Sequence, residues 1–170
     1  AELADEDFTQ AALALPNVVV TRSMSKAFGL AGLRIGYAIA APEVIGWMRA
    51  AGGPYAVAGP SMALALARLG LAESDVNAYL ERVRSERTAL FELLRELGYS
   101  PVPSQANFVF ARCPDPVGLR DALGRRGIGI RAFPGKRHLE DAVRITCPGD
   151  EADFERLRLA LREARKEMAP

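Results

Sequence analysis

The chain has 170 residues, of which 49% are hydrophobic and 25% charged, a balance typical of a globular protein that can bury a core. Its formal net charge of +1 predicts neither a nucleic acid nor a membrane surface as a partner, and no run of about 18 uncharged apolar residues predicts a membrane span. No signal peptide is visible, so a cytoplasmic protein is expected. The chain begins with Ala rather than Met, which indicates a fragment of a longer protein.

Cysteine and histidine are scarce. The two cysteines, Cys113 and Cys147, are too few and too far apart in sequence for a disulfide framework or a zinc site, so reduced, buried thiols are expected. The single histidine, His138, lies in a polar loop, which argues against a histidine-based catalytic triad or metal cluster. We therefore expect no metal.

The first part of the chain reads as the end of an α/β layer. Short β-branched or apolar runs at 17–20 and 33–40 predict two buried strands, with a loop between them. Residues 42–53 predict a short helix and 54–57 an extended segment. Residues 59–72 are rich in Ala and Leu on most sides, which predicts a buried helix. Two strands and two helices do not close a sheet core, so this part looks incomplete.

The clearest helix is predicted at 74–97, with Ser74 as its cap and Gly98 at its end. One stripe of this helix is apolar except for an arginine: Val76, Tyr79, Leu80, Val83, Arg87, Leu90, Leu94 and Leu97.

The pattern then changes to that of a small α+β unit. Strands are predicted at 106–112, 128–133 and 142–146, with helices at 116–127 and 150–168, the last capped by Asp150. The predicted fold class is therefore α/β. Residues 1–74 would be the end of a large domain and 75–170 a small C-terminal α+β domain, joined by the long helix 74–97.

Lys26 is one of only three lysines in a chain that otherwise uses arginine, and its surroundings suggest chemistry. A lysine held partly out of water in a tight loop loses its proton more easily, which frees the amine for Schiff-base formation. Ser23 and Ser25 supply hydroxyls, and Arg34 starts the next strand and can return to the same place. Two hydroxyls and a guanidinium suit a phosphate, and a phosphate beside a Schiff-base lysine indicates pyridoxal phosphate. A surface lysine in a Ser/Gly loop fits the same residue types.

The stretch "SMSKAFGLAGLRIGY", residues 23–37, resembles the cofactor loop of fold-type I pyridoxal-phosphate aminotransferases, above all the histidinol-phosphate aminotransferase branch. The resemblance implies that Lys26 binds the cofactor covalently, and that Ser23, Ser25 and Arg34 bind its phosphate. Two weaker motifs carry no function: residues 134–137 do not complete a P-loop, and the glycines of the cofactor loop do not match a dinucleotide-binding pattern.

The resemblance continues through "SQANFVFAR", "GIGIRAF" and "VRIT" to the C-terminus. It implies that Arg144 binds the substrate α-carboxylate and that Arg131 lies near a distal substrate phosphate, with Asn107 also near the site. Because arginine is so abundant in this chain, residue type alone would make both arginines ordinary surface residues of strands.

The implied activity is transamination between L-histidinol phosphate and 2-oxoglutarate in a homodimer. Aromatic amino-acid aminotransferase and threonine-phosphate decarboxylase activities share this loop and stay open. A different class also stays open, a truncated and catalytically inactive fragment. The family's Asp at the pyridine nitrogen, and its Asn and Tyr at the cofactor oxygen, would precede the part of the fold that the resemblance covers.

Overall fold

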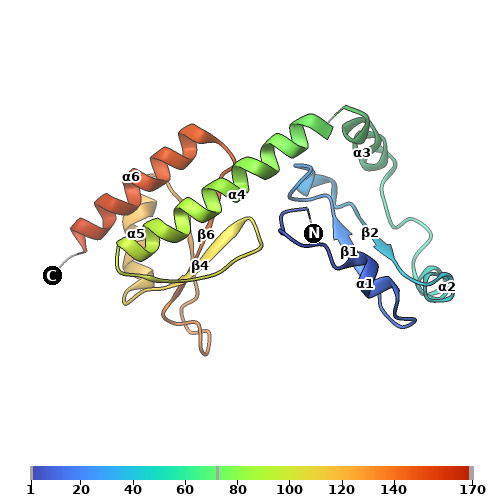
Figure 1. Cartoon of the computed structure of the whole chain (residues 1–170), viewed down its shortest axis with the longest axis horizontal. Coiled ribbons are helices and arrows are strands. Elements are labelled where there is room, and N and C mark those ends of the chain that lie inside the picture. Colours follow the sequence, from blue (N-terminus) through green and yellow to red (C-terminus); the bar gives the residue numbers. More distant parts are fainter. Residues whose placement is uncertain (1, 72, 169–170) are drawn as a thin grey trace. The chain divides into compact units, whose positions relative to one another are not determined.

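The computed structural model describes residues 2–71 and 73–168 and divides the chain into two compact units, residues 1–79 and 80–170 (Figure 1). The division falls inside the long helix, five residues after the end of the predicted large-domain segment at 74. The assignment of 1–74 to a cofactor-binding domain stays a prediction.

The first unit contains, in chain order, α1 (Thr9–Leu13), β1 (Val20–Ser23), the 3-10 turn η1 (Ala31–Leu33), β2 (Gly36–Ile39), α2 (Pro42–Ala51), α3 (Gly59–Leu71) and the start of α4 (Glu73–Glu96). β1 and β2 form an antiparallel pair in which Val20 lies opposite Ile39 and Ser23 opposite Gly36. The first strand therefore begins three residues later than predicted. Neither strand is buried. β1 alternates half-buried and exposed residues, β2 has two exposed residues followed by two half-buried ones, and the two strands form a sheet with no further strand beside them among the described residues.

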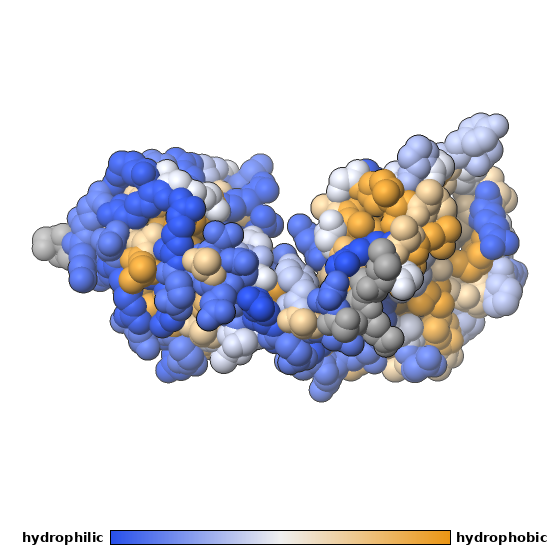
Figure 2. Space-filling view, turned by 90° about the horizontal axis from the view of Figure 1, so that it is seen from above, coloured by the Kyte–Doolittle hydropathy of each residue, from blue (hydrophilic) through white to orange (hydrophobic). Residues whose placement is uncertain are grey.

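The buried part of the first unit is small. Met24, Ile35 and Ala65 form its centre, and Phe28, Leu30, Leu33 and Val57 pack against it. The prediction that α3 is buried is wrong for the described residues, since four of its large apolar side chains are exposed: Met62, Leu64, Leu66 and Leu69. Residues 54–57, predicted as extended, form a turn and bend. Figure 2 shows the resulting apolar surface over this unit, at the right of the view.

The second unit contains the rest of α4, then β3 (Ser100–Val102), β4 (Phe108–Arg112), α5 (Pro116–Arg125), β5 (Arg131–Ala132), β6 (Ala142–Thr146) and α6 (Glu151–Glu167). The sheet has the order β3-β4-β6-β5, and every pair is antiparallel. β6 and α6 confirm the predictions, whereas β3 was not predicted. The predicted strand at 128–133 is shortened to two residues, because only Arg131 and Ala132 pair with β6.

Local sequence signals explain the helices of the second unit. The predicted stripe of α4 is buried or half-buried at every position, including Arg87. Gly98, with φ of 81°, provides the left-handed residue that ends this helix. The Asp150 carboxylate accepts a hydrogen bond from the Asp153 backbone N–H at 3.0 Å, which caps α6 as predicted. The predicted cap of α4 at Ser74 lies outside the described side chains.

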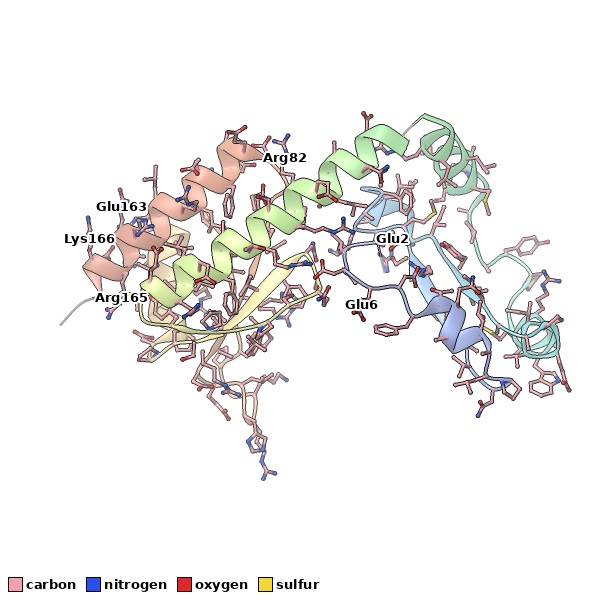
Figure 3. The ribbon with its side chains drawn as sticks, in the orientation of Figure 1. Glu2, Glu6, Arg82, Glu163, Arg165 and Lys166 are labelled. Atoms are coloured by element: carbon pink, nitrogen blue, oxygen red, sulfur yellow. The ribbon has the colours of Figure 1, made fainter. Side chains whose placement is uncertain are left out.

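Long side chains tie α6 to its neighbours in the second unit (Figure 3). The Arg165 Nε donates to the Leu97 carbonyl at 3.0 Å, at the end of α4. The Arg126 Nε lies 3.2 Å from a Glu163 carboxylate oxygen, just after α5. These contacts fix the helices that cover the core of the unit.

The two cysteines are free and buried in the second unit, as predicted. Burial is the main cause that raises the pKa of the Cys113 thiol to about 11 and that of Cys147 to about 12. Both are therefore protonated, unreactive thiols near neutral pH. None of the described helices is both long and apolar enough to cross a membrane.

Candidate active site

The connection between β1 and β2 carries the predicted cofactor residues and is folded by its own apolar side chains. Beyond the last strand pair, the Met24 N–H donates to the Ile35 carbonyl at 3.1 Å, and the Leu30 N–H donates to the Met24 carbonyl at 3.1 Å. Met24, Ala27 and Ile35 are buried. Because these residues turn inward, the polar residues between them are left toward the outside of the connection.

The pairing of β1 with β2 brings the predicted residues to one end of the hairpin. Ser23 lies opposite Gly36, so Ser25 and Arg34 are each two residues beyond the last pair. The Ser23 Oγ accepts a hydrogen bond from the Ser25 N–H at 3.2 Å. Arg34 has the left-handed angles φ 55° and ψ 39°, and its guanidinium donates to the Ala31 carbonyl at 3.0 Å.

Lys26 is exposed, as are Ser23 and Arg34, while Ser25 is half-buried. The expectation that the loop holds the lysine partly out of water is therefore wrong for this chain. The physical reason is that the neighbours Met24 and Ala27, rather than Lys26, supply the buried side chains.

The donor set of this connection fits a phosphorylated aldehyde. It offers an amine that can form a Schiff base, two hydroxyls and a guanidinium within twelve residues, Ser23 to Arg34. The residues present therefore suit pyridoxal phosphate.

An ion cluster forms around Arg22 of β1 and was not predicted. The Arg22 guanidinium contacts Glu2 at 2.9 Å and Asp7 at 2.7 Å, and it donates to the Thr9 hydroxyl at 2.7 Å. Glu2 is labelled in Figure 3. Hydrogen bonds from Thr9, and then the contact with Arg22, lower the pKa of Asp7 to about 2. Two acidic residues near the start of the described chain, Glu2 and Asp7, thus pair with Arg22.

The three predicted substrate residues lie in the second unit, on and beside its sheet. Arg144 of β6 lies directly opposite Phe110 of β4 on one side and Arg131 of β5 on the other. Asn107 precedes β4 and is half-buried, and its carbonyl accepts a hydrogen bond from the Cys147 N–H at 2.9 Å. The register thus brings Arg131 and Arg144 together as cross-strand neighbours.

Two aromatic contacts of these arginines were missed by the sequence analysis. The Arg144 guanidinium carbon lies 5.3 Å from the centroid of the Phe108 ring, and that of Arg131 lies 5.4 Å from the Phe133 ring. The alternation of Phe108 with Phe110 in β4 was visible in the sequence. It did not show which residues of other strands would share their face.

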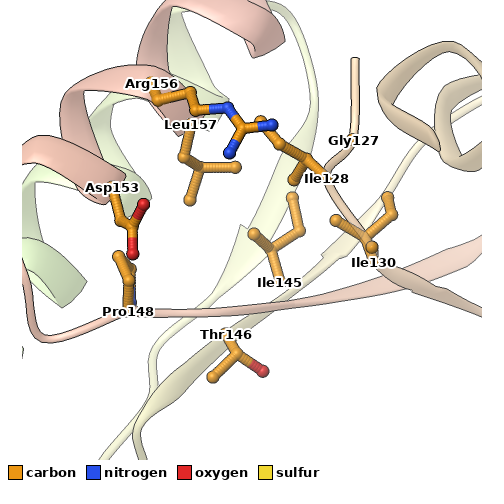
Figure 4. Close-up of a pocket in the computed structure, with 10 residues that line it drawn as sticks. Gly127, Ile128, Ile130, Ile145, Thr146, Pro148, Asp153, Arg156 and Leu157 are labelled. Atoms are coloured by element: carbon orange, nitrogen blue, oxygen red, sulfur yellow. The ribbon is translucent and has the colours of Figure 1, made fainter. Parts of the chain in front are cut away.

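The cavity drawn in Figure 4 has a volume of about 250 Å³ and lies in the second unit. Its lining includes Ile128, Ile130, Ile145, Arg156 and Leu157. None of the predicted substrate residues lines it, and Arg156 donates to the Arg126 carbonyl at 2.8 Å rather than standing free. The cavity therefore adds nothing to the candidate site.

Comparisons with known proteins identify the family. A family model described as aminotransferase class I and II matches residues 4–161. The aromatic amino acid aminotransferase of Mycobacteroides abscessus is 47% identical over 154 residues, covering 85% of this chain and 41% of that protein. The histidinol-phosphate aminotransferase of Symbiobacterium thermophilum is 36% identical over 156 residues, covering 87% of this chain and 42% of that protein.

A solved structure agrees with these matches. The histidinol-phosphate aminotransferase of Sinorhizobium meliloti, in complex with pyridoxal-5'-phosphate, matches with a TM-score of 0.80 at 28% identity. The match covers 99% of this chain and 47% of that one. The chain thus spans about two fifths of the length of these two curated relatives, in agreement with the C-terminal half that the resemblance implied. It belongs to the class I and II aminotransferases and has part of their fold-type I architecture.

Proposed function

We propose that the protein to which this chain belongs is a pyridoxal-phosphate-dependent aminotransferase that uses L-histidinol phosphate as amino donor and 2-oxoglutarate as acceptor. One observation carries the proposal. The β1–β2 connection of a member of this family holds a lysine, two hydroxyls and an arginine at one end of a hairpin. The histidinol-phosphate aminotransferase relatives support the choice of donor.

In this proposal the first unit holds the cofactor. Ser23, Ser25 and the Arg34 guanidinium would hold its phosphate, and the Lys26 amine would bind the cofactor covalently. When bound, the cofactor ring supplies an electron sink for the pair left at the substrate Cα. The Lys26 amine would act as the general base that takes the proton from that Cα.

The second unit would bind the anionic groups of the substrates. Arg144 offers a planar guanidinium that suits the α-carboxylate of 2-oxoglutarate through two parallel hydrogen bonds. Histidinol phosphate has no carboxylate, so its phosphate takes that role, with Arg131 beside it. Asn107 is proposed to lie near the same group. The family resemblance implies a homodimer, and we propose that the protein to which this chain belongs is active as a homodimer.

A second candidate is supported by one specific observation, the 47% identity to an aromatic amino acid aminotransferase. This candidate keeps the cofactor residues and changes the donor to an aromatic amino acid. The carboxylate of the aromatic amino acid would then bind the Arg144 guanidinium, and Arg131 would contribute little to binding. The two candidates therefore differ in how much the reaction depends on Arg131.

The experiment uses a protein of the relatives' length that contains this chain, with histidinol phosphate, tyrosine and threonine phosphate as separate amino donors. The main proposal predicts the highest kcat/KM with histidinol phosphate and a loss of at least tenfold for Arg131→Gln with that donor alone. Highest kcat/KM with tyrosine would favour the second candidate. Release of CO2 from threonine phosphate would favour a decarboxylase. Unchanged activity of Lys26→Ala would overturn the mechanism.

We also propose that the isolated chain, without the rest of the longer protein, is catalytically inactive. With the family's pyridine-nitrogen Asp lying outside the matched part of the fold, these 170 residues alone would be catalytically inactive. The same donor panel, run on the isolated chain with added cofactor, tests this, and turnover at the rate of the longer protein would contradict it.

A further inference from the structure

Two like charges face each other across the sheet of the second unit. Arg131 and Arg144 occupy directly opposed positions of the antiparallel pair β5–β6, so their side chains lie on the same face. Like charges in directly opposed positions destabilise a sheet. In the part of the chain that the structure describes, neither arginine forms an ion pair, and the buried Arg144 Nε has no acceptor. The unfavourable pair is thus left uncompensated by carboxylates.

The two guanidiniums contact aromatic rings instead of carboxylates. Arg144 lies over Phe108 and Arg131 lies over Phe133, each within the distance of a cation–π contact. Phe110, opposite Arg144 on β4, packs against Phe133 with ring centroids 5.9 Å apart and planes inclined by 44°. Each guanidinium therefore lies over a ring of its own, and a third ring, that of Phe110, packs against Phe133.

Arg112 on the same sheet shows the contrast. It alternates with Phe108 and Phe110 along β4 and therefore lies on the same face, yet it forms an ion pair with Asp141. Its guanidinium donates to the Asp141 carboxylate and to the His138 carbonyl, so two of its N–H groups are engaged. An arginine held by a ring face is oriented while its N–H groups stay available for an anion.

We propose that Phe108 and Phe133 are positioning residues, which hold the Arg144 and Arg131 guanidiniums ready to bind one anionic group of the substrate together. The proposal rests on the proposed function in that the anion is the phosphate of the amino donor. The bound anion would neutralise the opposed charges, so its binding is favoured by relief of their repulsion.

The test titrates inorganic phosphate into the 170-residue chain and follows the arginine Nε–Hε resonances by NMR. Phe133→Leu and Phe108→Leu are expected to weaken phosphate binding about two- to fivefold, as loss of a cation–π contact at a partly exposed site implies, while Phe133→Tyr keeps the wild-type affinity. Arg131→Gln should weaken binding more than either, and Arg112→Gln, the matched control on the same face, should leave it nearly unchanged.

Equal affinity of wild type and both leucine variants would overturn the proposal. So would a Phe133→Tyr variant as weak as Phe133→Leu, since that would indicate packing rather than the aromatic face. A second measurement needs no variant. The Hδ protons of Arg131 and Arg144 should show upfield ring-current shifts in the wild-type chain, and their absence would also contradict the proposal.

Failure of this proposal is distinguishable from failure of the proposed function. Phosphate binding in the second unit needs no cofactor, whereas the proposed function depends on Lys26 in the first. Phosphate affinity that does not change when Phe108 or Phe133 is replaced would exclude the positioning role but would leave the proposed role of Lys26 intact. If Lys26 does not bind the cofactor, the proposed function fails but the positioning role of the two rings stands.

Discussion

Glu86 of α4 is a buried carboxylate whose two oxygens lie in different surroundings. Only 4% of the residue is exposed, and one oxygen accepts a hydrogen bond from the Gly149 N–H at 2.8 Å. The other oxygen is buried and has no hydrogen-bond partner among the described residues. Gly149, with φ of 75°, lies in the turn from β6 to α6, so this carboxylate fastens the turn that follows the Arg144 strand.

Burial raises the pKa of Glu86 above the ordinary 4.5, opposed by the Gly149 hydrogen bond and by Arg82, and assisted by the nearby Asp150 charge. The folded state therefore binds the proton more readily than the unfolded state. The contribution of Glu86 to the free energy of unfolding is fully present below pH 4.5 and is lost as pH rises through the raised value. At pH values above the raised pKa the group is a buried charge with one oxygen left without a hydrogen bond.

Glu86→Gln tests this sign. The amide oxygen can still accept from Gly149, and no charge is buried, so the variant should be at least as stable as wild type at pH values above the raised pKa of Glu86. The difference in free energy of unfolding should shrink as the pH falls below the raised pKa, where wild-type Glu86 becomes neutral. Urea unfolding across this pH range measures it, and Glu86→Ala is the control that loses the acceptor. A wild-type minus Gln difference that does not vary with pH would contradict the prediction.

At the scale of elements, the β1–β2 hairpin determines where the Lys26 connection lies. Its register leaves no room for a side chain at Gly36, where a Cβ would lie 2.5 Å from the Arg22 carbonyl oxygen. Backbone atoms cannot move aside as the end of a flexible side chain can. Strand pairing and the shape of the connection therefore depend on this glycine.

Gly36→Ala is expected to lower the stability of the first unit by about 1–3 kcal/mol, the usual cost of forcing extra volume into a closely packed place. Gly46→Ala is the matched control. Gly46 lies in α2 with no atom near its added Cβ, so alanine there should be neutral or stabilise by about 0.5–1 kcal/mol. Thermal unfolding of the three chains gives the comparison. Equal effects of the two substitutions would contradict the close approach at Gly36.

The elements also show what the sequence could and could not predict. α4, β6 and α6 were predictable because their apolar period and their caps, such as Asp150, are local signals. The burial of α3 was predicted wrongly because an Ala/Leu-rich helix indicates an apolar surface but not whether a partner covers it. β5 was predicted too long because pairing with β6, which is not local, sets its ends.

In the candidate site, too, some residues could be predicted from local sequence signals and others depend on contacts that are not local. The proposed cofactor residues come from a contiguous motif, and their position on one hairpin depends only on the register of two adjacent strands: Ser23, Ser25, Lys26 and Arg34. The stacking of Arg131 on Phe133 and of Arg144 on Phe108 depends on pairing across three strands and on side-chain conformation. Arginine is so common in this chain that no local signal separated these two from the rest.

At the scale of the whole molecule, apolar surface is unevenly distributed. Exposed large apolar residues concentrate in the first unit: Phe8, Leu15, Trp47, Met48, Tyr55, Met62, Leu64, Leu66 and Leu69. The face of the second unit that Figure 2 shows, at the left of the view, is mainly hydrophilic. Contiguous apolar patches of this kind on a chain in water favour association.

The 170-residue chain is therefore expected to self-associate in a concentration-dependent way. Leu66→Glu, at a residue 62% exposed on α3, should reduce the association because it places a charge in the patch. Leu159→Glu, at a residue 61% exposed on α6, should leave it unchanged. Sedimentation velocity over a range of concentrations measures the effect. A monomeric wild-type chain, or equal effects of the two variants, would contradict the prediction.

The central claim is that the β1–β2 connection is a cofactor loop, and the three lysines of the chain provide its test. Lys26, Lys136 and Lys166 are all exposed, so nonspecific chemistry should label them alike. The measurement is incubation with pyridoxal phosphate, reduction with borohydride and peptide mass spectrometry, with Arg34→Gln as control. We predict a pyridoxyl group predominantly on Lys26, diminished in the Arg34 variant. Equal labelling of the three lysines, or none on Lys26, would contradict the assignment of the β1–β2 connection as a cofactor loop.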